Sequence, residues 1–300
     1  MFMKDKLVFT GIATPGAFNA GEDILGPDRV YHAVPGNKLQ EQFVVVLPKW
    51  ITHVSWLLSS KEVKFGRDQE FDTIVTFILE DAVEFLAHYG IESSIDSLPP
   101  DAFIMACVLA LKFKWKFEGY SSETPSGYPA VTMTGGTNGY FLDSAHPIIS
   151  VELDNGDQVV MCEADPVADE LTLKSHSETL LKVLARERSY EVDAIFPKLE
   201  IKATQNQTWM KNLWTTVHKT GRKAWILEAY LHLILNMNHV GIEAVLGQEA
   251  SMMLECASAK PTVIIDESFN LIYCRGGKML FSVHIPKDHA YWADPGEIKF

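Results

Sequence analysis

Phe196-Pro197-Lys198-Leu199-Glu200-Ile201, followed by Ile242-Glu243, by Gly247-Gln248-Glu249-Ala250 and then by Pro261 to Phe269, is the part of this sequence that decides the fold. The first stretch closes a run from Val192 to Ile201 that is rich in apolar residues, and we predict β structure there. The last stretch holds a second apolar, β-branched run, Val263 to Ile265, which predicts another strand.

The chain on both sides of these segments also favours strands. Apolar runs that are separated by Gly-rich or Asn-Gly turns are typical of antiparallel hairpins and meanders. Such runs are Val131 to Met133, Ile148 to Leu153 and Val159 to Met161, with turns at Gly135-Gly136 and Asn155-Gly156, and Phe269 to Tyr273 and Met279 to Ile285, joined by Gly276-Gly277. From Lys112 to Phe117, lysines alternate with aromatic residues, which is the period of two expected of a strand.

Helices are predicted mainly in the first half. Between Phe71 and Tyr89, apolar residues recur at spacings of three and four, which favours an amphipathic helix that Gly90 ends. Helical spacing returns from Ser177 to Arg186. Two short apolar runs, Phe43 to Leu47 before Pro48 and His53 to Leu58, are predicted as strands. The fold class is therefore α+β, with large antiparallel sheets and helices that come mainly from the N-terminal half.

The composition indicates one globular domain over residues 1–300. Hydrophobic residues make up 47% of the chain, and no low-complexity linker suggests a boundary. A net charge of -13 argues against a nucleic-acid partner, because phosphate contacts need clustered Lys and Arg. We accordingly predict that the three tryptophans between Trp209 and Trp225 pack in the core rather than form a stacking surface. No apolar run reaches the ~18–20 residues of a membrane span.

Motifs for catalysis, cofactors and metals are missing from the sequence. There is no G-x-S-x-G elbow, no H-E-x-x-H, no phosphate-binding loop and no dinucleotide fingerprint, so we expect no enzyme activity and no cofactor. The histidines lack ligand spacing, and the four cysteines form no C-x-x-C, so we expect no metal site. Four free thiols are predicted, although their even number leaves disulfides open in an exporting cell.

The sequence does not decide between a cytoplasmic and a secreted chain. Lys4 and Lys6 precede an apolar segment, and Ala17 to Ala20 is similar to a signal-peptide cleavage site, but two Thr, two Gly and a Pro make that segment a poor apolar core. A cytoplasmic chain and a secreted chain without a clear cleaved signal peptide both fit. Asn206 begins the glycosylation sequence Asn206-Gln207-Thr208, which matters only if the chain is exported.

Several segments, taken in order from about Glu80 onward, resemble the serpins, a superfamily of serine protease inhibitors. Leu109 to Lys116 resembles the strand that in serpins reads Asn-Ala-x-x-Phe-Lys-Gly-x-Trp, and Val131-Thr132-Met133 resembles the Val-x-Met-Met strand. Phe196-Pro197-Lys198 resembles the Leu-Pro-Lys strand, and Asp266 to Phe269 stands in place of Asp-x-Pro-Phe. The resemblance implies a reduced serpin-like domain with a shortened N-terminal helical region, similar to the compact serpins of poxviruses.

The resemblance also implies a reactive loop at residues 247–261. In serpins, a protease cleaves this exposed loop, which then inserts into the main sheet as a new strand and traps the enzyme. The implied hinge is Gly247, Gln248, Glu249 and Ala250, and the implied scissile region is Ala257, Ser258, Ala259, Lys260 and Pro261.

Three departures from the serpin pattern oppose insertion of that loop. Met252 and Leu254 are large where the family has small residues, and Leu109 replaces a buried Asn that helps the central strands to part. The loop is also roughly four residues shorter than an inhibitory serpin needs, which removes ~13 Å of reach.

Three functions follow from these expectations. The first is a serpin-like protein with impaired protease trapping, which binds a protein partner as an interaction protein or decoy and is host-modulating if it is viral. The second is an active inhibitor of a serine or cysteine protease with an atypically short loop. The third, an unrelated α+β enzyme, rests only on the fact that sites can be built on any fold. We expect a monomer with no nucleic-acid or membrane partner.

Overall fold

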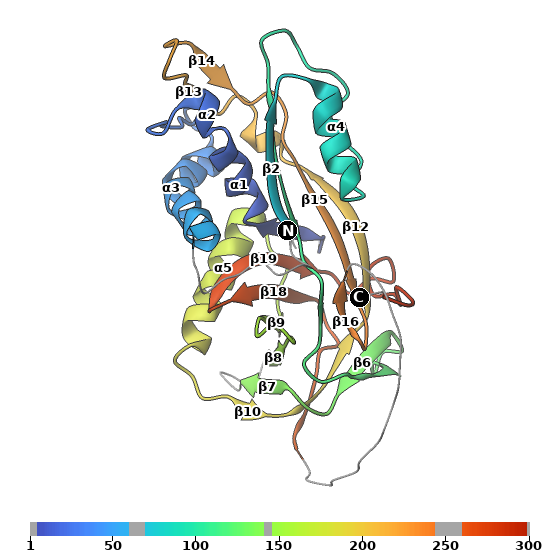
Figure 1. Cartoon of the computed structure of the whole chain (residues 1–300). Coiled ribbons are helices and arrows are strands. Elements are labelled where there is room, and N and C mark those ends of the chain that lie inside the picture. The colour runs from blue at the N-terminus through green and yellow to red at the C-terminus, as the bar shows by residue number, and fades with distance from the viewer. Residues whose placement is uncertain (1–4, 60–69, 141–145, 244–259, 299–300) are drawn as a thin grey trace. The chain divides into compact units, whose positions relative to one another are not determined.

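The computed structural model describes residues 5–59, 70–140, 146–243 and 260–298 (Figure 1). Its contacts divide the chain into two compact units, each assembled from separate segments. Unit 1 comprises Met1–Thr10, Leu111–Ala203 and Leu233–Phe300, and unit 2 comprises Gly11–Ala110 and Thr204–His232. Helices and antiparallel strands occur in both, which confirms the α+β class. The expectation of one domain over residues 1–300 stays a prediction.

A seven-stranded sheet lies in unit 1 (Figure 1). In spatial order its strands are β1 (Val8–Gly11), β19 (Lys278–Ile285), β18 (Phe269–Arg275), β9 (Gln158–Glu163), β8 (Ile148–Glu152), β7 (Thr137–Tyr140) and β10 (Tyr190–Glu191). Every residue of β18 is buried, and apart from Asn270 and Arg275 the strand is built of apolar and aromatic residues, as expected of a strand covered on both faces. Gly276 and Gly277 join β18 to β19 with φ of 54° and 73°, the conformation that tight hairpin turns require. The hairpins predicted at Asn155-Gly156 and Gly276-Gly277 are confirmed, because β8 pairs with β9 and β18 pairs with β19. The predicted meander is wrong at its first strand: Val131–Met133 lies in β6 (Pro129–Met133), which belongs to another sheet than β7, so Gly135-Gly136 connects two sheets and closes no hairpin.

Helix α5 (Glu170–Leu184) packs against β19. It begins seven residues before the predicted start at Ser177, because Asp169 is its N-cap: the Asp169 carboxylate accepts a hydrogen bond from the Thr172 N–H at 2.8 Å. The helix turns Leu173 inward, and its buried Ser177 shares a hydrogen bond of 2.8 Å with Ser282 of β19.

Asp169→Ala is expected to lower the free energy of unfolding by ~1 kcal/mol, because it leaves a backbone donor of the first turn without its side-chain acceptor. For a chain of this size the melting temperature should fall by ~2–4 °C. Thermal denaturation followed by circular dichroism measures this. Asp165→Ala, at an exposed position just before the helix, is the matched control. An equal fall in both variants would show that the cap has no specific role.

The stretch Phe196–Ile201 spans the junction of two strands rather than one. Strand β11 (Asp193–Pro197) belongs to a four-stranded sheet with order β17 (Thr262–Ile264), β11, β6 (Pro129–Met133), β5 (Tyr120–Glu123). Phe196 is fully buried and meets the Trp115 ring edge-on at 5.8 Å. Lys198, at the junction, is only 3% exposed, and its ammonium pairs with Asp294 at 2.5 Å and donates to Ser121 at 2.9 Å. A buried charge is tolerated here because it is paired and hydrogen-bonded.

A second four-stranded sheet has the order β12 (Leu199–Asn206), β15 (Tyr230–Met237), β16 (Gly241–Glu243), β4 (Phe113–Lys114). The predicted strand through Lys112 to Phe117 is therefore much shorter than expected. The apolar run before it forms a separate strand, β3 (Ile104–Ala110), which ends where the alternating segment begins.

Unit 2 contains a helical group and two small sheets. Its elements are α1 (Ala13–Ala20), α2 (Glu22–Leu25), α3 (Lys38–Ser59), β2 (Glu70–Thr76), α4 (Leu79–His88), β3, the 3-10 turn η1 (Thr208–Met210), β13 (Trp214–Thr216) and β14 (Lys223–Trp225). Strands β2 and β3 pair antiparallel over their whole lengths, and α4 contacts both. Helix α1 contacts β3 and α3.

Helix α3 corrects two of the sequence predictions. The runs Phe43–Leu47 and His53–Leu58, predicted as strands, both lie inside this helix. The buried residues Phe43, Leu47, Trp50, Val54 and Leu57 recur at alternating spacings of four and three, which is one face of a helix. The β-branched residues and Pro48 suggested short strands, but the apolar pattern across both runs outweighed these local preferences.

The prediction of one helix between Phe71 and Tyr89 is only partly correct. The first part of this segment is β2, and only Leu79–His88 is helical. The predicted end is confirmed: Gly90 has a φ of 71°, and the Ile91 N–H bonds to the Leu86 carbonyl at 3.1 Å, so the chain leaves the helix through a left-handed residue.

The hairpin β13–β14 corrects the prediction for the tryptophans. Trp209 and Trp214 are half-buried, but Trp225 is 56% exposed and does not pack in a core.

Candidate functional site

The candidate site lies where the chain leaves one sheet of unit 1 and enters another. Strand β16 ends at Glu243, and β17 begins at Thr262. Residues 244–259 between them lie outside the described residues, and they include the predicted hinge, Gly247, Gln248, Glu249 and Ala250, and three scissile-region residues, Ala257, Ser258 and Ala259. Those assignments stay predictions, and the structure places the two ends of the segment.

The N-terminal end is held between two strands. Ile242 of β16 pairs with Met237 of β15 on one side and with Phe113 of β4 on the other, both antiparallel. Ile242 is 4% exposed, so its side chain points into the core side of the sheet. Because successive side chains of a strand alternate between faces, an extension of β16 would turn even-numbered residues inward.

A tight turn before β16 fixes that register. Asn238, 1% exposed, accepts hydrogen bonds through its side-chain oxygen from the N–H groups of Val240 at 2.8 Å and Gly241 at 3.3 Å. The indole N–H of buried Trp115 donates to the Asn238 carbonyl at 2.8 Å. These bonds join β15, β16 and the chain after β4. The serpin resemblance implied a strand here, because His239 to Ala250 resembles the strand and hinge that lead into the reactive loop. Periodicity gave no such indication, since three residues are too few to show it, but the Asn238-x-x-Gly241 turn is a local signal.

The C-terminal end of the segment is held by β10 and β11. The Lys260 ammonium donates to Glu191 at 2.7 Å, and this hydrogen bond raises the pKa of Lys260. The Asp193 N–H donates to the Pro261 carbonyl at 3.1 Å, and β17 then runs parallel to β11. Lys260 and Pro261, the two members of the predicted scissile region that are described, thus lie at the fixed end of the segment.

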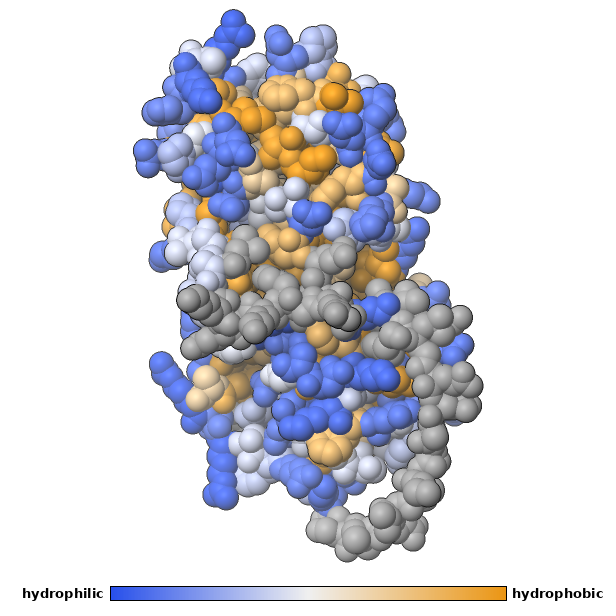
Figure 2. Space-filling model, viewed as in Figure 1, coloured by the Kyte–Doolittle hydropathy of each residue, from blue (hydrophilic) through white to orange (hydrophobic). Residues whose placement is uncertain are grey.

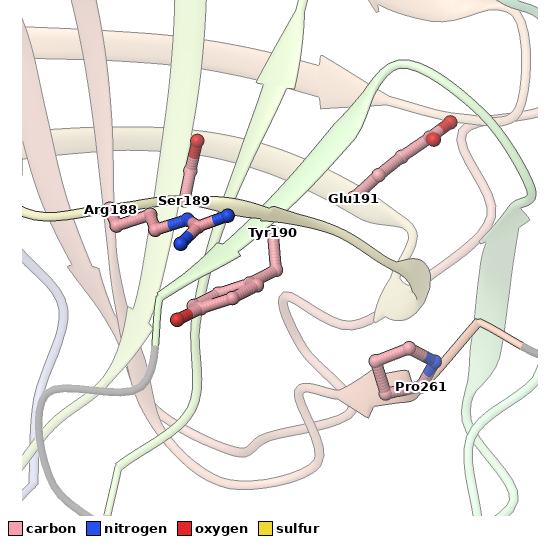
Figure 3. A pocket seen from close by; sticks show the side chains of 5 residues that line it. All are labelled: Arg188, Ser189, Tyr190, Glu191 and Pro261. Carbon is pink, nitrogen blue, oxygen red and sulfur yellow. The ribbon is translucent and has the colours of Figure 1, made fainter.

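A shallow hollow of about 460 Å³ lies beside that end (Figure 3). Arg188, Ser189, Tyr190, Glu191 and Pro261 line it. The Arg188 guanidinium lies 5.5 Å from the centre of the Tyr190 ring, and both residues are exposed. A hollow this open does not enclose a small molecule in the way that ligand pockets do. It offers a contact surface beside the returning segment.

The structure also describes the predicted glycosylation sequence and three of the four cysteines. Asn206, the last residue of β12, is exposed, as is Thr208, so the glycosylation sequence is accessible and its use stays a prediction. Cys107, Cys162 and Cys274 are free thiols, and Cys256 lies outside the described residues. Burial raises the pKa of Cys107 strongly and that of Cys274 to about 12, so neither is a reactive thiolate at neutral pH.

The described part of the chain contains neither a group of side chains that could hold a metal ion nor a helix that could span a membrane. No group of three or more His, Cys, Asp or Glu side chains there could hold a metal ion. No helix there has both the length and the apolar character to cross a bilayer.

Solved structures match this fold, although no family model and no curated protein matches the sequence. A thermophilic serpin, tengpin, in its native state aligns with a TM-score of 0.62 and 10% identity over 95% of this chain and 90% of that one. Thyroxine-binding globulin in complex with thyroxine aligns with a TM-score of 0.57 and 13% identity over 95% of this chain and 94% of that one. Mouse protein-Z dependent protease inhibitor aligns with a TM-score of 0.57 and 13% identity over 94% of this chain and 91% of that one. These likenesses show that the chain has the serpin fold, and they reach across nearly its whole length.

Proposed function

We propose that this serpin-fold chain is a protease-inhibitor-like protein that presents residues 244–261 to a protein partner and whose protease trapping is impaired. The observation that carries the proposal is the pair of fixed ends, β16 in one sheet and Lys260-Pro261 beside another. A segment held at both ends is offered to a partner as a loop, and loops on a rigid scaffold carry recognition in many proteins.

Impaired trapping follows from the side chains that would enter the sheet. Since Ile242 points inward, a strand that continued β16 would turn Leu246, Gln248, Met252 and Leu254 inward. Placing such side chains in a slot shaped for small residues costs ~1–3 kcal/mol each.

Leu109 is a further obstacle to trapping. It lies in β3, half-buried and paired with Phe71 of β2, at the position where serpins carry a buried Asn. A leucine has no polar group to exchange hydrogen-bond partners when strands separate, so at this position it cannot do what the serpin Asn does.

An active inhibitor is the second candidate, and β16 itself favours it. This strand already pairs on both sides, six residues before the predicted hinge residue Gly247. An earlier start adds ~20 Å of reach at ~3.3 Å per residue, which exceeds the ~13 Å that the short loop was expected to lack. Loop length therefore does not exclude trapping, and the inward side chains become the main obstacle.

Incubation of the full chain with a panel of serine and cysteine proteases tests the proposal. We expect the first cleavage between Gln248 and Lys260, located by mass spectrometry of the fragments, because exposed loop tips are preferred sites of nicking. A denaturing gel should show the cleaved chain and free protease, with no covalent complex.

Three outcomes of this panel would contradict part of the proposal. A covalent complex with any protease would establish the active inhibitor instead. A first cut elsewhere, with this segment resistant, would contradict the exposed loop. A chain that no protease cleaves or binds would contradict a protease-class partner.

A further inference from the structure

The hairpin β13–β14 in unit 2 carries an unneutralised group of cations. Between Thr204 and His232 the sequence has four basic residues and one acidic residue, although the whole chain has a net charge of -13. The four cations, Lys211, Lys219, Arg222 and Lys223, are exposed, and within the described ranges none has a carboxylate partner. In Figure 2 hydrophilic residues line the upper left margin of the view, where Figure 1 places β13 and β14.

One face of the hairpin combines one of these cations, Lys223, with aromatic rings. The Trp214 ring stacks on His32 with centroids 4.2 Å apart, and the Lys223 ammonium lies 4.2 Å from the Trp214 centroid. Trp225 is the cross-strand partner of Trp214, so both indoles and Lys223 lie on the same face. Trp225, which is 56% exposed, therefore offers an apolar contact on the same face as the Lys223 cation.

Strand β14 also has a free outer edge among the described residues. The sheet has two strands, and β13 is bridged on its other side by His32, whose N–H donates to the Trp214 carbonyl at 2.7 Å. The Val217 N–H bonds to the Arg222 carbonyl, so in the alternating antiparallel pattern the backbone groups of Lys223 and Trp225 point away from β13. An edge with such groups is a template for another strand.

We propose that an extended, acidic segment of a partner protein binds here by adding to the edge of β14 as a third strand. Its carboxylates would meet Lys223, Arg222 and Lys219, and an apolar residue would cover Trp225. The backbone groups of Lys223 and Trp225 match a peptide backbone, which nucleic acids and polysaccharides lack. The charge is complementary to an acidic segment, whereas a long polyanion would also meet the repulsion of the acidic remainder of the chain.

Fluorescence anisotropy with the full chain tests this, using a labelled peptide of alternating Glu and Val as the probe. We expect saturable binding that weakens with added salt. Lys223→Glu should weaken it about tenfold or more, because it replaces an attractive charge with a repulsive one. Trp225→Ala should weaken it by a similar factor, because truncating an exposed aromatic anchor removes its contact area. Lys202→Glu, at an exposed lysine of β12, is the matched control and should leave binding unchanged.

A second peptide, N-methylated at alternate residues, tests the strand addition and should bind about tenfold more weakly, since its backbone donors are blocked. Equal binding of both peptides would overturn the strand addition. Absence of acidic-peptide binding, or binding that neither hairpin variant changes, would overturn the site. Tighter binding of oligothymidylate or of a sulfated polysaccharide through the same residues would overturn the assignment to a protein partner. Melting curves of each variant confirm that it is folded.

Discussion

Cleavage between Gln248 and Lys260 is expected to change the melting temperature by a few degrees at most. If the cleaved segment cannot enter the sheet, the cut adds no burial, and the free energy of unfolding changes by ~1 kcal/mol, which corresponds to ~2–4 °C. Full insertion would instead bury a new central strand, and a gain of ~10 kcal/mol would raise the melting temperature by tens of degrees. Differential scanning calorimetry of the intact and the nicked protein distinguishes these results.

Two double variants test whether the large inward side chains are what keeps the cleaved segment out of the sheet. Met252→Ala with Leu254→Ala removes two of the large side chains that would face inward, and we expect this protein, once nicked, to melt well above its intact form. Met253→Ala with Glu255→Ala changes the neighbouring outward positions and should behave like the unmodified chain. A large rise in the nicked, unmodified chain would contradict impaired trapping and favour the active inhibitor. No rise in either variant would place the obstacle elsewhere, with Leu109 as the next position to change.

The parts of the fold that the sequence predicts are those in which local pattern and burial agree. The mainly apolar run Phe269–Tyr273 and the turn Gly276-Gly277 predict β18, β19 and their hairpin, because a strand covered on both faces is rich in apolar residues. Helix α3 was missed because Val44, Val45 and Val46 favour strands locally, while the spacing of Phe43, Leu47 and Trp50 favours a helix. In that case tertiary burial outweighed propensity.

The contacts at the two ends of the candidate site could not be predicted from the sequence. The serpin resemblance implied a reactive loop at residues 247–261, which stays a prediction, and the structure describes the chain on either side of residues 244–259, at β16 and at Lys260. Strand β16 depends on a turn at Asn238 that is completed by Trp115, a residue far away in the sequence. The partner of Lys260 is Glu191, equally remote. Contacts between such distant positions leave no periodic signal, so one sequence alone cannot reveal them.

Asp157→Ala is expected to lower the free energy of unfolding by ~3–5 kcal/mol, the largest single-residue effect that we predict here. Asp157 is 4% exposed and Arg275 is 6% exposed. The Asp157 carboxylate accepts hydrogen bonds from Arg275 Nε at 2.8 Å and from the Tyr273 hydroxyl at 2.8 Å. Its removal takes the Asp157 carboxylate away from a buried guanidinium and from a buried hydroxyl that donates to it. The melting temperature should fall by ~5–15 °C.

Two comparisons separate the charge from the packing. Glu152, the last residue of strand β8, forms an ion pair with Lys116, and the two side chains are 36% and 46% exposed. Glu152→Ala breaks this ion pair and should lower the free energy of unfolding by at most ~1 kcal/mol, because water screens an exposed pair. Asp157→Leu combined with Arg275→Met and Tyr273→Phe removes both charges and the hydroxyl together, and should recover much of the lost stability, since apolar groups of similar volume need no partner. If the triple variant is no more stable than Asp157→Ala, the loss comes from altered packing at the turn Asn155-Gly156 rather than from an unpaired charge. If Glu152→Ala costs as much as Asp157→Ala, burial does not govern the strength of these ion pairs in the sheet.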